Sequence, residues 1–366
     1  MNLKDIAAGF RFFGTVESIE PHGNGHINDT YLVVCRDGEA VHQYIMQRLN
    51  TRIFPNYQGL MRNIETVTDY LRDIIRSQGG DCLRECMTPI RTIDGATYQI
   101  VNRDCWRAYL FIDNTVAYQI ADDKNIFADS GRAFGRFIAR LDGFDASGLC
   151  EVIENFHNTK DRYAKFCASL QADPLGRSAS AQEEIAFVTQ RNAYCGKIVD
   201  ALSRGEIPLR VTHNDTKLNN VLIDKTSGKA ICVIDLDTIM PGSLLYDFGD
   251  SVRFGCSTAL EDEQDLSKVD FDLSLYEAYC EGFLDGIGDK ITTAELDMLH
   301  IGSILMTYEC GMRFLTDYLD GDLYFKTAYP EHNLVRARTQ FKLVGRMEAC
   351  SEKMIEIAHK YCVRKK

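Results

Sequence analysis

The sequence has no long apolar run, and no stretch approaches the roughly 18 uninterrupted apolar residues of a membrane-spanning helix. Residues 1–14 show neither such a run nor a cleavage pattern, so no signal peptide is expected. Positive charge is scarce: 41 Lys and Arg face 53 Asp and Glu, a formal net charge of −12. Because nucleic-acid binding needs clustered Lys and Arg, we expect no nucleic-acid partner. With no predicted span and no signal peptide, we also expect a cytoplasmic protein that does not bind membranes.

Paired cysteine motifs are also missing. The thirteen cysteines are odd in number and include no C-x-x-C pair; Cys82 and Cys86 lie four apart with no second pair behind them. The eight histidines show no ligand spacing. We expect reduced cysteines that pack as small apolar residues, and no structural metal site.

The 366 residues can bury a large core, and their number suggests two domains or lobes. The beginning of the chain is predicted to hold β-strands and one helix: Thr15–Glu20, Asn28–Cys35, Ala40–Gln47, helix Asn56–Arg76, a hairpin of Pro89–Ile93 with Thr97–Val101, and Trp106–Ile112. The remainder is mainly helical by its apolar periodicity: Ala128–Leu141, Ala181–Leu202, Ala294–Leu319 and Asn333–Tyr361. We predict an α+β, protein-kinase-like two-lobed fold, with a small antiparallel-sheet lobe in residues 1–112 and a large, mainly helical lobe in residues 113–366.

A strand pair interrupts the predicted helices within Val211–Asp237. Asn220 follows Asp215 by five residues, which gives the pattern H-x-D-x-x-x-x-N. Two apolar strands, Val221–Ile223 and Ala230–Ile234, then flank a turn, and Asp235 ends the second strand. Such a hairpin brings the residue before its first strand close to the residue after its second strand.

This pattern predicts phosphoryl transfer. Asn220 and Asp235 offer the oxygen ligands that suit Mg²⁺, and Asp215 can accept the proton of an attacking hydroxyl. Asp and Asn are common turn residues, so an isolated D-x-x-x-x-N would mean little. Here the His, the spacing, the hairpin and the final I-D-L-D agree. The later Tyr246–Asp250 mimics D-F-G, but it lies past the required strand. We therefore interpret Asp247 and Asp250 as structural residues that bind the backbone of the catalytic loop.

The sequence resembles the aminoglycoside phosphotransferase and choline kinase superfamily, and within it the bacterial N-acetylhexosamine 1-kinases. The catalytic block is specific to the superfamily, and flanking motifs carry the closer resemblance: G-N-G-H-I-N-D-T-Y (Gly23–Tyr31), Y-I-M-Q-R-L-N (Tyr44–Asn50), W-R-A-Y (Trp106–Tyr109), M-P-G-S-L-L-Y-D-F-G-D-S-V-R-F-G (Met240–Gly255) and E-C-G-M-R-F-L-T-D-Y-L (Glu309–Leu319). The resemblance implies that Asp215 is the general base, that Asn220 and Asp235 bind Mg²⁺, and that ATP places its adenine at a hinge near Leu110–Asp113, which includes Phe111 and Ile112. It also implies a hexosamine bound in the large lobe.

One departure from the wider kinase pattern concerns the nucleotide phosphates. The third strand usually offers them a Lys or Arg, and this chain has Gln47 there. Because a cation about 4 Å from a phosphate is worth about 4 kcal/mol at an effective dielectric near 20, a replacement is expected. Lys217 is the candidate, since Arg48 points to the opposite face of a regular strand. The loop with Gly23 and Gly25 is expected to let backbone N–H groups approach the phosphates.

The acceptor is expected to meet the helix Ala294–Leu319, where Glu309, Arg313 and Asp317 recur every four residues. Such a stripe is by default a solvated face, but the resemblance implies that Arg313 and Tyr324 contact a sugar. Two alternatives stay open. One is another acceptor: another sugar, an aminoglycoside or a choline-like alcohol. Glu261–Asp265 could supply carboxylates for the two cationic classes, but this run also fits a solvated loop. The other is a catalytically inactive nucleotide-binding module. The sequence does not predict the oligomeric state.

Overall fold

A computed structural model describes residues 2–23, 27–120 and 123–362, and the chain divides into two compact units. The first unit comprises residues 1–117, 143–154 and 221–240; the second comprises residues 118–142, 155–220 and 241–366. The units thus alternate along the sequence, whereas the predicted lobes are contiguous, and the boundary after residue 112 stays a prediction. No helix in the described part of the chain has the length and apolar character needed to cross a bilayer.

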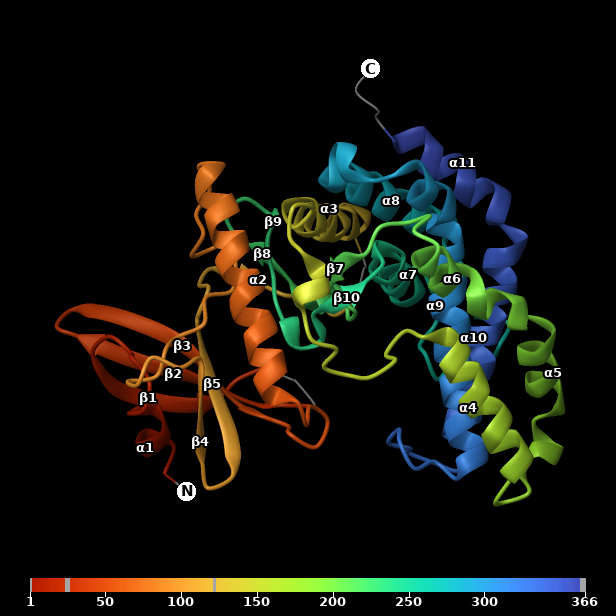
Figure 1. Cartoon of the computed structure of the whole chain (residues 1–366), viewed down its shortest axis with the longest axis horizontal. Coiled ribbons are helices and arrows are strands. Elements are labelled where there is room, and N and C mark those ends of the chain that lie inside the picture. Colours follow the sequence, from red (N-terminus) through yellow and green to blue (C-terminus); the bar gives the residue numbers. More distant parts are fainter. Residues whose placement is uncertain (1, 24–26, 121–122, 363–366) are drawn as a thin grey trace. The chain divides into compact units, whose positions relative to one another are not determined.

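The first unit is built on a five-stranded antiparallel sheet with the strand order β1-β2-β3-β5-β4 (Figure 1). Its strands are β1 (Thr15–Pro21), β2 (Asp29–Asp37), β3 (Ala40–Leu49), β4 (Tyr98–Val101) and β5 (Asp104–Leu110). Alternate residues of β2, β3 and β5, among them Val33, Met46 and Trp106, form a buried apolar core with the short helix α1 (Leu3–Ala7). The helix α2 (Tyr57–Ser77) is amphipathic, with buried apolar residues recurring every three or four positions.

A smaller sheet of the same unit has the order β6-β8-β9, from Thr115–Val116, Val221–Asp224 and Ala230–Val233. β8 and β9 form the hairpin predicted after the catalytic loop, and Val221 pairs with Val233. The β4–β5 hairpin corrects the sequence prediction, because Tyr98–Val101 pair with β5 and not with Pro89–Ile93. The tight turn is at Asn102 and Arg103, which both have positive φ as the favoured two-residue hairpin turn requires.

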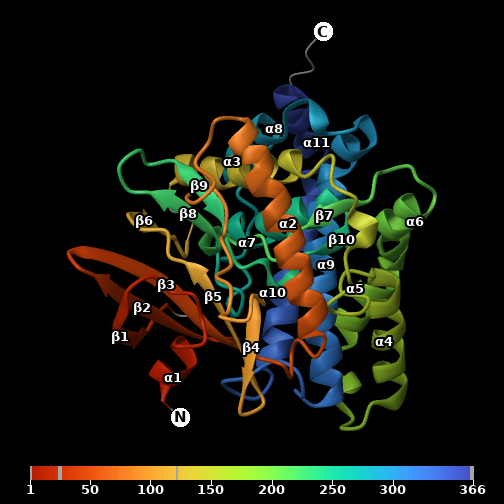
Figure 2. The same ribbon diagram turned by 60° about the vertical axis from the view of Figure 1, so that its left-hand side comes forward.

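The second unit is mainly helical (Figures 1 and 2). Its helices are α3 (Lys124–Arg140), α4 (Thr159–Ala172), α5 (Gln182–Gln190), α6 (Lys197–Ser203), α7 (Leu244–Gly255), α8 (Leu273–Ile287), α9 (Thr293–Asp320), α10 (His332–Ala349) and α11 (Ser351–Tyr361); the short strand β7 is Arg210–Thr212, and β10, Met240–Gly242, adjoins the unit border. The long helix α9 packs against α4, α7 and α10, while α3 packs closely along α8. The predicted α+β class, with an antiparallel sheet first and a mostly helical remainder, is confirmed.

Two predicted helices are interrupted. Ala181–Leu202 is two helices, because a 3₁₀ turn at Asn192–Gly196 separates α5 from α6. Asn333–Tyr361 is also two helices, because α10 ends at a C-cap on Cys350 and α11 begins at Ser351. The helix Ala294–Leu319 is confirmed as α9, whose start is fixed by a capping box between Thr292 and Glu295.

Candidate active site

The predicted catalytic loop, residues 213–220, follows β7 in the second unit and ends in a 3₁₀ turn. The His213 side chain is fully buried, and the rings of Phe134 and Phe137 on α3 meet it edge-on at centroid distances of 5.6 and 6.2 Å. Asn214 adopts a left-handed backbone conformation with φ of 64°, which Asn tolerates better than most residues. His213 therefore anchors the loop, and its burial supports a structural role for this residue.

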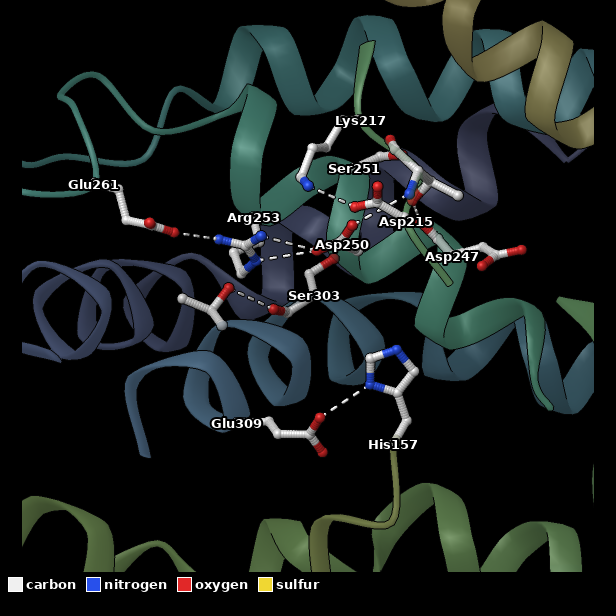
Figure 3. A network of polar contacts seen from close by, with 12 residues as sticks. His157, Asp215, Lys217, Asp247, Asp250, Ser251, Arg253, Glu261, Ser303 and Glu309 are labelled. Atoms are coloured by element: carbon white, nitrogen blue, oxygen red, sulfur yellow. Dashed lines mark hydrogen bonds and ion pairs between the residues drawn. The ribbon is translucent and has the colours of Figure 1, made fainter. Parts of the chain in front are cut away.

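Two carboxylates of α7 hold the backbone of the catalytic loop (Figure 3). The oxygens of Asp247 accept the N–H groups of His213 at 2.8 Å and of Asn214 at 2.7 Å. Asp250 accepts the N–H of Thr216 at 3.2 Å. The structural role predicted for Asp247 and Asp250 is thereby confirmed, and the D-F-G-like stretch is the start of a buried helix.

The two α7 carboxylates differ in their electrostatic surroundings. Burial raises the pKa of Asp247 to about 6, although the charge of His213 and the two backbone N–H groups partly offset this effect. Burial would also raise the pKa of Asp250, but the charges of Arg253 and Lys217 outweigh it and hold that pKa below the usual value. Arg253 Nη2 lies 2.9 Å from Asp250 Oδ1. Asp247 therefore binds the loop at an electrostatic cost, whereas nearby cations compensate the charge of Asp250.

Both oxygens of Asp215 have partners, yet its side chain keeps 30% of its surface exposed. Lys217 Nζ lies 2.6 Å from Oδ1, and Asn220 Nδ2 donates to Oδ2 at 3.1 Å and to the backbone carbonyl of Asp215 at 2.8 Å. Burial would lower the pKa of Lys217, but the charges of Asp215 and Asp250 prevail and raise it. The loop thus presents a fixed carboxylate beside a charged ammonium group, and the structure brings three of the predicted residues together.

A buried acid on α9 lies below the catalytic loop in Figure 3. Glu309 is almost fully buried and binds His157 Nδ1 at 2.9 Å and the Thr159 hydroxyl at 2.5 Å. Burial opposes its ionisation, but His157, Thr159 and the charge of Arg313 hold the pKa of Glu309 below its usual value. Glu309 therefore ties the segment before α4 to α9 and does not form part of a solvated stripe.

One turn further along α9, Arg313 lines a pocket of about 130 Å³. The pocket also contains Arg162 and Lys165 of α4, the aromatic residues Tyr324 and Phe325, and the carboxylates of Asp317 and Asp320. The Arg313 guanidinium lies 5.9 Å from the Tyr324 ring centroid and 5.5 Å from that of Phe325. Burial lowers the pKa of Arg162, and the nearby charge of Arg313 lowers it further. The structure thus places Arg313 and Tyr324 in one pocket whose side chains include three cations.

Asp317 supports the segment that carries Tyr324. Its carboxylate accepts the backbone N–H groups of Leu323, Tyr324 and Phe325 at 2.7–2.9 Å. Asn333 on α10 donates to the same carboxylate at 2.9 Å. Because these donors use both oxygens, Asp317 acts as a cap for the segment after α9.

Basic side chains of the chain itself pair with the acidic run Glu261–Asp265. Glu261 lies 3.0 Å from Arg253, and Asp262 lies 3.1 Å from His332. Lys268 approaches the side chains of Glu263 and Asp265. These carboxylates are therefore already compensated, which weighs against a ready site for a cationic acceptor.

In the first unit, Gln47 is joined to a cation that the sequence analysis missed. Its Oε1 accepts a hydrogen bond from Arg107 Nε at 3.0 Å, and its Nε2 donates to the Thr30 hydroxyl at 3.1 Å. Arg107 is buried and lies 2.6 Å from Asp237. An arginine within the otherwise apolar strand W-R-A-Y was the available signal, since such a residue needs a buried partner.

The residues predicted to bind the nucleotide also lie in the first unit. Gly23 has φ of 75°, and a Cβ added there would meet no atom within 4 Å; Gly25 lies outside the described residues. The His22 ring meets Phe111 edge-on at 5.7 Å, so the start of the glycine loop lies beside the predicted hinge. Phe111 donates its N–H to Gln43, and the Ile112 carbonyl accepts the Thr115 hydroxyl.

The two predicted metal ligands belong to different units. Asn220 ends the catalytic loop of the second unit and is buried. Asp235 follows β9 in the first unit and has a left-handed backbone with φ of 61°, just before a 3₁₀ turn at Leu236–Thr238. The hairpin that separates them along the chain is confirmed, while their shared metal site stays a prediction.

A family model described as a phosphotransferase enzyme family matches residues 18–283. Among solved structures, a microcompartment-associated aminopropanol kinase is similar with a TM-score of 0.64 at 18% identity, over 96% of this chain and 97% of that chain. The choline kinase of Cryptosporidium parvum Iowa II gives a TM-score of 0.59 at 11% identity, over 98% of each chain. A spectinomycin phosphotransferase in complex with ADP and spectinomycin gives 0.51 at 15% identity, over 98% and 97%. These likenesses confirm the predicted protein-kinase-like fold.

Proposed function

The chain belongs to the phosphotransferase enzyme family, and on that premise we propose that it transfers the γ-phosphoryl group of ATP to the anomeric hydroxyl of an N-acetylhexosamine. The main support for this proposal is the carboxylate of Asp215, which is held in place and partly exposed. Kinases need such a base beside the acceptor hydroxyl, together with positioned charges around the phosphates.

In this proposal Asp215 orients the hydroxyl and takes its proton. Lys217 holds the Asp215 carboxylate in position, because its ammonium group lies 2.6 Å from Oδ1, and we assign it a contact with the transferred group. Asn220 orients the carboxylate through the bond to Oδ2. A base held from two sides loses little freedom when the acceptor binds, and this preorganisation favours transfer.

The nucleotide would use residues of the first unit, and Mg²⁺ would use Asn220 and Asp235. We assign the phosphates to the loop of Gly23 and Gly25 and to Gln47, and the adenine to Phe111 and Ile112. The open surroundings of Gly23 and the contact of His22 with Phe111, which brings the start of the glycine loop beside the hinge, support this assignment. An amide and a carboxylate oxygen suit Mg²⁺, which takes its other ligands from phosphate and water and, when bound, neutralises charge on the phosphates.

The pocket of Arg313 and Tyr324 supports a neutral, polar acceptor. Aminopropanol and choline carry a positive charge at neutral pH. The three cations of the pocket outnumber its two carboxylates, Asp317 and Asp320, and the Asp317 oxygens already accept backbone N–H groups, so the pocket disfavours such a group on balance. A sugar instead offers hydroxyl and amide oxygens to guanidinium donors and a ring face to Tyr324. We therefore assign Arg313 and Tyr324 to sugar binding and favour N-acetylglucosamine and N-acetylgalactosamine over amine acceptors.

A panel of acceptors tests this function. ADP release is measured with MgATP and N-acetylglucosamine, N-acetylgalactosamine, glucose, galactose, choline or kanamycin, with Asp215→Asn as the matched control. We expect turnover with the N-acetylhexosamines and a loss of about 10²–10⁴-fold in the variant, the usual worth of general-base assistance. Turnover only with choline or kanamycin would refute the acceptor assignment. An active Asp215→Asn would refute the assigned base, and ATP binding without any turnover would favour an inactive nucleotide-binding module.

A further inference from the structure

A row of polar side chains crosses the middle of the five-stranded sheet in the first unit. Thr30, Gln47 and Arg107 are register partners on β2, β3 and β5, and hydrogen bonds join them in that order. Their neighbours Met46 and Trp106 belong to the apolar core on the other face. Because side chains alternate along a strand, the row lies on the face away from that core.

Arg107 is the one charged member of this row, and a carboxylate fixes it. Nη1 lies 2.6 Å from Asp237 Oδ1, and Asn28 Nδ2 donates to the other oxygen of Asp237 at 2.8 Å. Burial opposes the charge of Arg107, but the neighbouring charges, Asp237 first among them, raise its pKa. A buried ion pair adds little stability compared with an apolar pair of similar size, so stability alone is a weak explanation for it.

The same face carries donors without partners. A guanidinium has five N–H donors, and within the described part of the chain Arg107 Nη2 makes no hydrogen bond. Two residues further along β5, the buried hydroxyl of Tyr109 also has no partner among the described residues. Asp237, which binds Arg107, lies in the 3₁₀ turn that directly follows Asp235, the proposed Mg²⁺ ligand. These donors are therefore close to a proposed ligand of the metal that accompanies the phosphates.

We infer that Arg107 supplies the cation for the ATP phosphates that a Lys or Arg on the third strand would otherwise supply. In this arrangement Asp237 is a positioning residue that holds the guanidinium, Gln47 accepts its Nε–H beside the phosphates, and Nη2 remains for a phosphate oxygen. The planar fork of Arg suits this task, since one edge can bind a carboxylate while another meets phosphate. Lys217 is committed to Asp215 and acts beside the base. The inference rests on the proposed ATP-dependent function.

The test compares nucleotide binding by Arg107→Met with that of Arg107→Met/Asp237→Asn. The single variant leaves Asp237 as an unpaired buried charge and so risks misfolding, whereas the double variant removes both charges. Arg48→Met is the matched control, because Arg48 neighbours Gln47 on β3 and pairs at the surface with Asp29 and Asp104. Calorimetric titrations use MgATP and, separately, adenosine, which lacks phosphates; circular dichroism checks the fold.

We expect the double variant to bind MgATP about 10- to 100-fold more weakly than the wild type, the size of a charge-assisted hydrogen bond. Its affinity for adenosine should stay within about twofold, and Arg48→Met should bind both ligands like the wild type. Wild-type affinity for MgATP in the double variant would overturn the inference and leave the proposed function standing. An equal loss for adenosine would overturn it as well, because the phosphates would not be the cause. A wild-type protein that binds no nucleotide would refute the proposed function itself.

Discussion

The catalytic loop depends on residues whose charges are balanced differently. The charges of Arg253 and Lys217 lower the pKa of Asp250. For Asp247, the backbone N–H groups and His213 lower the pKa less than burial raises it. The carboxylate that makes more hydrogen bonds to the loop is thus the one that is more costly to ionise. The contacts that fix the loop around Asp215 therefore cost the folded protein some stability, as is common at functional sites.

The pKa of Asp247 gives stability a definite pH dependence. This pKa is about 6 in the folded chain and 3.8 in the reference state, so folding favours the protonated acid. Its contribution is fully present below about pH 4 and is lost as the pH rises through about 6, a difference of about 3 kcal/mol. We predict that the free energy of unfolding of the wild type, relative to Asp247→Asn, falls by about this amount between pH 4 and pH 7.

Urea unfolding of both proteins at several pH values measures this difference. The Asp247→Asn substitution also removes one hydrogen-bond acceptor, and the resulting constant loss does not change the slope. Asp250→Asn is the control: because the pKa of Asp250 is lowered, its contribution is lost only on acidification below about pH 4. A flat or rising difference for Asp247→Asn would show that the backbone N–H groups and His213 outweigh burial.

At the scale of elements, the packing of α3 against α8 positions the loop through Phe134 and Phe137. Glycines on both helices permit the close approach: Gly131 and Gly135 face the α8 backbone, and Gly282 and Gly286 face the α3 backbone. A Cβ added at Gly282 would lie 1.8 Å from the carbonyl oxygen of Ala128, so the helices would have to separate.

We predict that Gly282→Ala lowers the free energy of unfolding by about 2 kcal/mol or more, as overpacking does. Gly345→Ala is the matched control, since Gly345 lies inside α10 and has nothing within 4 Å of an added Cβ. That substitution should stabilise the protein by about 0.5–1 kcal/mol through helix propensity. Urea unfolding measures the free energy of unfolding of both variants. Equal effects for the two would contradict the close packing of α3 on α8.

The sequence predicted elements where its signals are local. The apolar period predicted α9, and the turn between two apolar runs predicted the β8–β9 hairpin. The break at Cys350 was not predictable, because the apolar period continues across it. The role of Arg107 was missed for another reason: it depends on the register between β3 and β5, which pairs residues sixty positions apart.

At the scale of the whole molecule, net charge says little about the acceptor. The chain carries a formal charge of −12, yet in the pocket of Arg313 three cations outnumber the two carboxylates. The acidic run that could have bound a cationic acceptor is tied to Arg253, His332 and Lys268. Local pairing of charges, which composition does not reveal, therefore favours a neutral sugar.

Phosphoryl transfer to an anomeric hydroxyl is checked by the position of the phosphate on the product. The wild-type protein is incubated with MgATP and N-acetylglucosamine, and phosphorus and proton NMR spectra locate the new phosphate. We predict a phosphate ester coupled to the proton on the anomeric carbon, and no such signal with Asp215→Asn. A phosphate coupled to the protons of another carbon, or no sugar phosphate although ATP is bound, would contradict the claim.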